Sequence, residues 1–167
     1  PRICFINKLD RMGASFEKSF DSILQRLTPN AVAVTIPIGL EGDFAGIIDL
    51  VQMKTITFDG ERGEKVGEHD IASDRKEEAE KWRARLIEKV AETDDALTEK
   101  FLEGGDISVD ELRAALRKAT LAYCLIPVFC GSALKNKGVQ VLLDGVIDYL
   151  PAPTDVSAIQ GRDPKTD

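Results

Sequence analysis

ICFINKLD, residues 3–10, joins a short apolar run directly to a polar tetrapeptide. LIPVFCGSAL, residues 125–134, has the same arrangement, with an apolar run that leads into a loop of small residues. Each run has the length and composition of a buried strand. Ligands of open α/β sheets bind outside the carboxyl ends of the strands. We therefore expect the two loops to lie side by side and to hold the faces and the edge of one flat base.

The polar tetrapeptide Asn7-Lys8-Leu9-Asp10 fits guanine better than adenine. An ionised Asp10 accepts through two oxygens, and guanine presents two adjacent donors, its ring N–H and its exocyclic amine. Adenine has an acceptor at the ring position and leaves the carboxylate unpaired, and a mismatch of this kind lowers binding by about 10⁴ or more. The methylene stem of Lys8 can lie on one ring face, and Asn7 can tie the loop to the base edge or to neighbouring backbone.

The second loop supplies the other half of the predicted guanine site through Ser132, Ala133 and Leu134. The backbone N–H of Ala133 is expected to be free for the guanine carbonyl, because small residues let the chain approach closely. Leu134 is expected to cover the opposite ring face. The alternative is that Asn7 and Asp10 only cap the following helix, which residues of these types often do.

The two motifs are separated by much more chain than a crossover needs. Asp10 and Ser132 are 122 positions apart, whereas a crossover connection takes about a dozen residues or more. Runs rich in Val, Ile, Thr and Phe, separated by Gly-containing turns, predict antiparallel strands at 31–38, 44–51 and 54–58. We therefore expect an α/β fold into which an α+β subdomain is inserted.

Apolar residues at helical spacing predict helices on both sides of these strands. The first begins near Ala14 or Ser15 and ends at Thr28-Pro29. The longest covers about 73–92, and Trp82 is expected to lie in the core of the insert. A short helix follows that contains Leu97. The last two helices begin at a capping box, Ser108-Val-Asp-Glu111, and at about residue 139.

Composition and charge narrow the possible partners. The chain has 167 residues and a formal net charge of −7, so little direct contact with RNA is expected, because phosphate contacts need Lys and Arg. No apolar run approaches the ~20 residues of a membrane span, and no membrane partner is expected. Neither the cysteines nor His69, which we place in a polar surface loop, has metal-ligand spacing. We predict no metal ligand and no catalytic residue.

NKLD followed by GSAL resembles the two guanine-recognition motifs of translational GTPases. Within that class the chain is similar to the elongation factor G family, bacterial or organellar, over nearly its whole length. The resemblance implies a partial P-loop-type GTPase sheet, with the last two parallel strands and their helices. It depends on the segments NKLDRMG (7–13), PIG (37–39), GIID (46–49), GSALKNKGV (131–139), LLD (142–144) and YLP (149–151).

The resemblance also implies a division of the chain and a set of partners. Residues 1–27 and 124–153 correspond to the C-terminal part of a GTP-binding domain, 28–123 to an inserted subdomain, and 154–167 to a linker. The implied ligand is GTP or GDP, bound in the cytoplasm or in a mitochondrial or plastid matrix. The implied partner is the ribosome, with the insert contacting the ribosomal stalk protein.

The phosphate-binding half of a GTPase is not found in this sequence. No G-x-x-x-x-G-K-[ST] occurs, and that loop cradles the phosphates and places the Mg²⁺ ligand. D-x-x-G occurs at 10–13 and 43–46, but neither match precedes NKLD, so we interpret both as chance. Because Pro1 leads straight into a strand, we expect a piece of a longer GTPase. The isolated chain is predicted to be inactive, with its Mg²⁺ ligands elsewhere.

Other interpretations remain open. A release factor or a ribosome-protection protein also carries an insert after N-K-x-D, and a stand-alone protein-interaction module is a further alternative. The acidic residues of the longest helix, such as Glu77, Glu78 and Glu80, form either a solvated face with i,i+4 pairs or a surface for a basic patch on the stalk protein. A dinucleotide-binding enzyme is disfavoured, because no G-x-G-x-x-G follows a strand.

Overall fold

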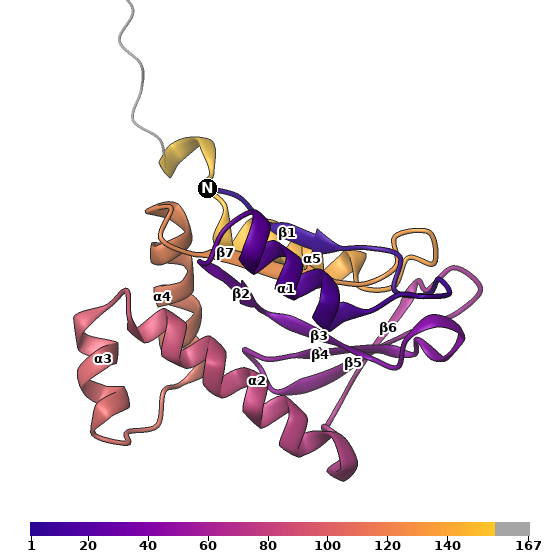
Figure 1. Cartoon of the computed structure of the whole chain (residues 1–167), viewed down its shortest axis with the longest axis horizontal. Helices are drawn as coiled ribbons and strands as arrows, with labels where there is room; N and C mark the ends of the chain where they lie inside the picture. Colours follow the sequence, from indigo (N-terminus) through magenta and orange to yellow (C-terminus); the bar gives the residue numbers. More distant parts are fainter. Residues whose placement is uncertain (156–167) are drawn as a thin grey trace, which may run out of the picture.

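A parallel sheet and an antiparallel sheet lie beside each other, and helices flank both (Figure 1). The computed structural model describes residues 1–155. Residues 156–167, most of the predicted linker, lie outside the described part. In the described part, no helix is both long enough and apolar enough to cross a membrane. The expected α/β fold with an inserted α+β part is confirmed.

The parallel sheet has three strands in the order β1-β7-β2. Strand β1 (Cys4–Ile6) and strand β2 (Ala31–Ala33) flank the central β7 (Ile126–Cys130). The register places both Cys4 and Ala33 opposite Val128. The sequence predicts only two strands here, because the third belongs to a run that we assigned to the antiparallel sheet.

That run, residues 31–38, is divided between the two sheets. After β2 the chain enters β3 (Thr35–Ile38), which is antiparallel to β4. Val34 joins them: its N–H donates to Val128 O at 2.9 Å, and its carbonyl accepts from Leu50 N at 2.9 Å. The predicted single strand is wrong, because a continuous buried apolar run contains no signal for the residue at which it leaves one sheet.

The antiparallel sheet has the order β3-β4-β5-β6. Strands β4 (Gly46–Asp49) and β5 (Lys54–Asp59) confirm two predicted strands. Strand β6 (Lys65–His69) pairs with β5 where we predicted a polar loop. The prediction failed because β6 is an exposed edge strand, whose polar side chains give no hydrophobic pattern. A 3-10 turn, η1 (Glu41–Asp43), lies between β3 and β4.

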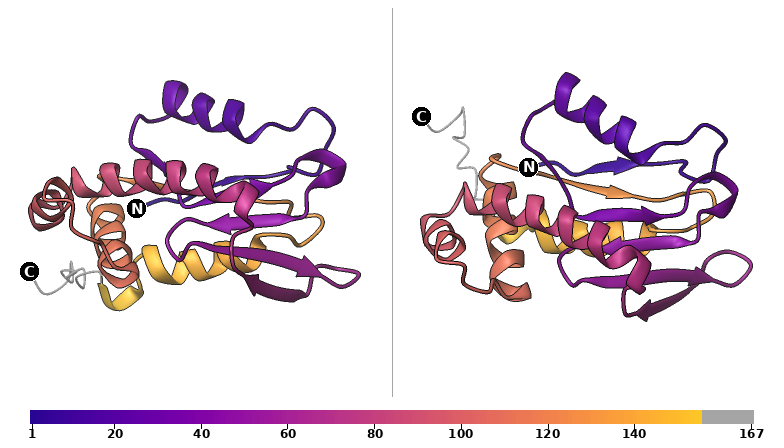
Figure 2. Two further views of the ribbon diagram at one scale, coloured as in Figure 1. Left: turned by 90° about the horizontal axis from the view of Figure 1, so that it is seen from below. Right: turned by 60° about the horizontal axis from the view of Figure 1, so that its bottom comes forward.

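Two helices cover opposite faces of the parallel sheet (Figure 2). Helix α1 (Phe16–Arg26) contacts β1 and β2, and α5 (Val139–Tyr149) lies against β7 on the other face. The predicted capping box is confirmed at Ser108 and Glu111, where α4 begins. The remaining elements are α2 (Ser73–Ala91), α3 (Asp95–Leu102), α4 (Val109–Leu121) and the 3-10 turn η2 (Pro153–Asp155).

Trp82 of α2 packs against α1, so it does not lie only within the insert. Its ring meets Phe16 edge-on at 5.6 Å and Phe20 at 5.4 Å between centroids. Aromatic pairs in this geometry contribute about 0.5–1.5 kcal/mol beyond the burial of their area. The expectation of a core within the insert is corrected: Trp82 holds the insert against the helix that follows the NKLD loop.

Candidate functional site

The two predicted loops lie side by side at the carboxyl ends of β1 and β7. These strands are parallel, with Ile6 opposite Cys130, so both chains leave the sheet at the same edge. Backbone hydrogen bonds continue past the strand ends. Gly131 N donates to Ile6 O at 3.0 Å, and Leu9 N donates to Gly131 O at 3.2 Å. The residues that the sequence separates by more than a hundred positions therefore form one continuous surface.

Asn7 joins the two loops. Its Oδ1 atom accepts from Lys8 N at 2.8 Å and from Ala133 N at 2.9 Å. The expectation that the Ala133 N–H is free is therefore wrong in this structure, because Asn7 Oδ1 already accepts its hydrogen bond. The helix-capping alternative is also wrong, since the N-cap of α1 is Ser15, whose side chain accepts from Lys18 N.

Lys8 has a left-handed backbone conformation, with φ of 65°. Such a conformation is uncommon for residues other than glycine and costs about 1–3 kcal/mol, so the surrounding structure must hold it. The bonds of Asn7 and Leu9 on either side do so. The side chain of Lys8 is exposed and leaves its stem accessible from solvent.

The second loop lowers the pKa of Asp10. The pKa of its carboxyl group is lowered, chiefly by a hydrogen bond from the Ser132 hydroxyl and less by the charges of Arg11 and Lys135. Ser132 itself is fully buried. Asp10 itself is partly exposed. A negatively charged acceptor therefore faces solvent beside the end of β1.

The second loop is closed at its base. Ser132 and Lys137 exchange two backbone hydrogen bonds, of 2.9 and 3.0 Å. Asn136 within this turn has φ of 53°, a second left-handed residue that is not glycine. Leu134 is 75% exposed, although its side chain is wholly apolar. The turn therefore holds an apolar side chain in water.

Of the groups predicted to contact a base, three side chains are open to solvent, Ser132 is buried and the Ala133 N–H is the exception among the backbone groups. The carboxylate of Asp10, the stem of Lys8 and the side chain of Leu134 are accessible from solvent. The exception is the Ala133 N–H, which must leave Asn7 Oδ1 before it can donate to a base carbonyl. Within residues 1–155, no three His, Cys, Asp or Glu side chains are grouped as a metal site.

One residue at the site was missed by sequence reasoning. Glu41, in the turn η1, donates its N–H to Leu9 O at 2.7 Å, and its carboxylate accepts from Gly13 N at 2.7 Å. The sequence EGD at 41–43 indicates only a turn. Nothing in its spacing points to residues 9–13, because the contact depends on how the antiparallel sheet sits against the parallel one.

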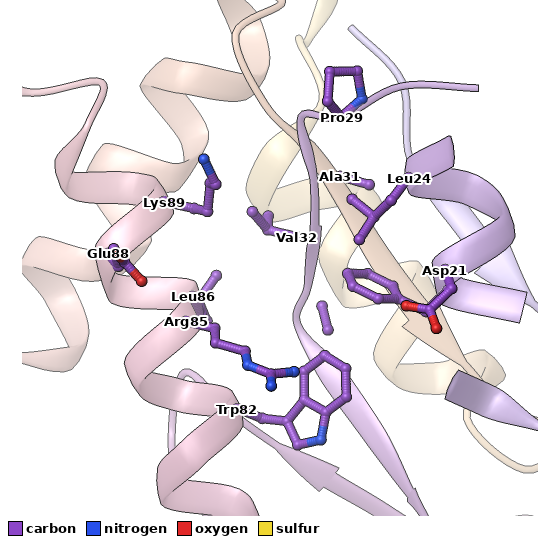
Figure 3. A pocket seen from close by; sticks show the side chains of 12 residues that line it. Asp21, Leu24, Pro29, Ala31, Val32, Trp82, Arg85, Leu86, Glu88 and Lys89 are labelled. Atoms are coloured by element: carbon purple, nitrogen blue, oxygen red, sulfur yellow. The ribbon is translucent and has the colours of Figure 1, made fainter. Parts of the chain in front are cut away.

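A separate pocket of about 320 Å³ lies between α1 and α2, over β2 (Figure 3). Phe20, Leu24 and Trp82 form its apolar walls, and Arg85 lies over the Trp82 ring at 4.9 Å. No predicted site residue lines it. His69 also lies away from the loops, on the exposed edge strand, where Nε2 is 3.1 Å from Thr57 Oγ1.

These features define the class of the chain: part of a GTPase-type α/β sheet with an inserted subdomain. Residues 1–152 match the family model described as elongation factor Tu GTP binding domain, and the chain belongs to this family. A crystal structure of a Thermus thermophilus protein is similar, with a TM-score of 0.80 and 26% identity. The match covers 93% of this chain and 23% of that one, so the chain spans about a quarter of that relative.

Proposed function

We propose that this chain supplies guanine recognition to a GTP-binding translation factor of the elongation factor G type. The observation that carries the proposal is the hydrogen bond from Ala133 N to Asn7 Oδ1, which joins the two motifs at the ends of adjacent strands. The family match supports a GTP-binding role. In factors of the type that the sequence resembles, GTP hydrolysis drives the movement of tRNA and mRNA through the ribosome.

The residues of the two loops divide the recognition of the base between them. The Asp10 carboxylate accepts from the ring N–H and the exocyclic amine of guanine, and the Ser132 hydroxyl lowers the pKa of that carboxyl group. The stem of Lys8 and the side chain of Leu134 supply apolar contact to the ring. The Ala133 N–H reaches the base carbonyl when that oxygen replaces Asn7 Oδ1 as its acceptor.

The phosphate chemistry belongs to other parts of the longer protein. Phosphoryl transfer depends on a phosphate-binding loop, a Mg²⁺ ligand and a group that orients water. The 167 residues contain no G-x-x-x-x-G-K-[ST] sequence. We therefore assign base selection to this chain, and hydrolysis to the protein that contains it. The isolated chain is expected to bind GDP weakly and to hydrolyse no GTP.

The insert is proposed to contact the ribosomal stalk protein through the acidic face of α2. Part of this face is paired internally, with Arg75 to Glu78 at 3.1 Å and Lys76 to Glu80 at 4.0 Å. Ion pairs this exposed add little stability, so they exchange readily for a charged partner. Glu77 takes part in neither pair, and a basic patch on the partner that meets these glutamates accelerates association.

Nucleotide titration of the full-length protein and of this chain tests guanine recognition. Replacement of two charge-assisted hydrogen bonds in Asp10→Asn is expected to weaken GDP binding by about 10²- to 10⁴-fold. Xanthosine diphosphate should regain affinity, because its 2-carbonyl accepts from the new amide. Asp21→Asn, an exposed change on α1, is the control. Equal affinity of the full-length protein for GDP and ADP would refute the proposal, and tight GDP binding by the isolated chain would refute the division of roles.

Charge reversal on α2 tests the stalk contact. Replacing Glu77, Glu78 and Glu80 by Lys should slow association with the stalk protein and lower ribosome-stimulated GTP turnover. Turnover without ribosomes should stay the same, because within residues 1–155 no ion pair joins these side chains to the loops. An unchanged titration with the stalk protein would exclude this surface.

A protein-interaction module is the second candidate, and the exposed acidic face of α2 is the observation that favours it. A pull-down with the stalk protein that succeeds while the full-length protein binds no guanine nucleotide would favour this candidate. A release factor or a ribosome-protection protein fits the family match equally well. We propose a cytoplasmic location, with an organellar matrix as the alternative.

A further inference from the structure

We infer that Glu41 is a positioning residue for the guanine-binding loop, so that a turn of the inserted sheet holds residues 9–13 in shape. The inference rests on the proposed function, because it assigns a new residue to the same site. Glu41 does not belong to either motif, and it reaches the loop from an element that the sequence places in the insert.

Glu41 contacts the loop at two points on either side of Asp10. Its backbone N–H donates to the carbonyl of Leu9 at 2.7 Å, and its Oε1 atom accepts from the N–H of Gly13 at 2.7 Å. A hydrogen bond to a charged group is about twice as strong as one between neutral groups. Together the two bonds fix the chain at Leu9, directly before the carboxylate that reads the base, and at Gly13, three residues after it.

The turn that carries Glu41 is itself held in a strained form. Glu41 has φ of 56°, a left-handed conformation that glycine would adopt without strain. Gly39, with φ of 71°, permits the turn, since a Cβ atom there would lie 2.1 Å from Asp43 O. A strained backbone of this kind persists where the surrounding structure holds it, and here the side chain accepts from the Gly13 N–H.

The same turn also contacts the second loop. Lys137, which closes the Ser132 turn, donates its Nζ to Phe44 O at 3.0 Å. A second turn of the insert approaches from β5 and β6: a Cβ on Gly63 would lie 2.7 Å from Lys135 O, and Gln140 Nε2 donates to Gly63 O at 3.1 Å. Both base-reading loops therefore rest on turns of the inserted sheet.

The conformation of the base-reading loops therefore depends on their contacts with the insert. A substitution that removes the Glu41 carboxylate should leave the fold of the insert intact. The turn keeps its backbone hydrogen bonds, from Asp43 N to Leu40 O and from Ala45 N to Ile38 O. The substitution removes one bond to the chain beside Asp10. The expected result is a loop that samples other conformations and binds the base with lower affinity.

The test uses Glu41→Ala in the full-length protein, with a fluorescent GDP analogue as the probe. Loss of one charge-assisted bond is expected to raise the dissociation constant by about five- to tenfold, chiefly through faster dissociation. Glu41→Gln keeps an acceptor for the Gly13 N–H and should restore most of the affinity. Asp43→Ala is the matched control, because no hydrogen bond or ion pair of residues 1–155 uses the Asp43 side chain.

Hydrogen exchange without nucleotide provides a readout that does not depend on guanine binding. Peptides that contain residues 9–13 should exchange faster in Glu41→Ala than in the wild type or Asp43→Ala. If the wild type binds the probe and Glu41→Ala binds it equally well, the inference is overturned and the proposed function stands. Unchanged exchange overturns it as well. If the wild type binds no guanine nucleotide, the proposed function fails, and Glu41 is then a structural residue of the loop alone.

Discussion

The Oδ1 atom of Asn7 lies 2.9 Å from the backbone nitrogen of Ala133 and accepts its hydrogen bond. The bond spans 126 positions of the sequence and connects the ends of two parallel strands. Asn7 also accepts from Lys8 N, so one side-chain oxygen orders both loops. Its removal should therefore affect both loops at once.

Asn7→Ala should lower the free energy of unfolding by about 1 kcal/mol, because two hydrogen bonds at an exposed position are lost. The affinity for GDP should fall by about tenfold in the full-length protein, since neither loop keeps its conformation. Chemical denaturation and nucleotide titration measure the two effects. Asn30→Ala, which alters an exposed asparagine in the turn before β2, should change neither. A normal GDP affinity in Asn7→Ala would show that the bridge is dispensable.

Gly145→Ala should destabilise the fold, although alanine favours a helix over glycine by about 1 kcal/mol. A Cβ atom at Gly145 of α5 would lie 2.3 Å from Cζ of Phe129 in β7. We expect a net loss of about 1–3 kcal/mol from this overpacking, measured by thermal or urea unfolding. Gly42→Ala is the control, because a Cβ there meets no atom within 4 Å. A stability equal to the wild type would mean that α5 moves away from the sheet at no cost.

Ser132→Ala should raise the pKa of Asp10, because the Ser132 hydroxyl is the main cause of its lowering. A carboxyl group with a lowered pKa stabilises the folded state above the ordinary pKa of about 3.9. That contribution is lost as pH falls through the lower value. In the variant the loss should begin at a higher pH, and NMR titration of the Asp10 side-chain carbon measures this. Ser108→Ala, far from the loops, should leave the Asp10 titration unchanged.

Cys124 and Cys130 should differ strongly in their reaction with a thiol reagent. Cys124 is exposed, whereas Cys130 is fully buried and burial raises the pKa of its thiol to about 12. Cys124 should react at the rate of a free thiol, and Cys130 only after unfolding. Because the unfolded thiol ionises near pH 9, the folded state should lose stability as pH rises from about 9 to 12. Mass spectrometry of labelled peptides gives the order, and rapid labelling of Cys130 would contradict the packing of β7.

Much of the fold follows from local sequence. The strands at 4–6 and 126–130, the capping box at Ser108 and the helix at 73–91 all have strong periodic or capping signals. The edge strand β6 was missed because its side chains face solvent and carry no pattern. The division at Val34 was missed because the buried run around it is uniformly apolar. A hydrophobic pattern indicates which residues are buried, but it does not indicate which sheet a buried residue joins.

The residues of the candidate site were proposed one by one from the sequence, but the bonds between its parts were not. Asn7, Asp10 and Ser132 were identified from their type and from their place after a strand. The Ala133 N–H was expected to be free and is not, since Asn7 reaches it across the two loops. No sequence pattern indicated the contact of Glu41 with residues 9–13. That contact depends on how the two sheets pack against each other, which no short motif encodes.

The sequence by itself determined the chemistry of this chain: the acceptor at Asp10, the small residues of the second loop and the apolar strands that precede both. These are local properties, set by side-chain type and by spacing along the chain. Only the tertiary structure decided which groups meet. The parallel pairing of β1 with β7 brings Asn7 to Ala133, and the position of the inserted sheet brings Glu41 to Gly13. Long-range hydrogen bonds depend on the packing of whole elements, and packing is settled only when the entire chain has folded.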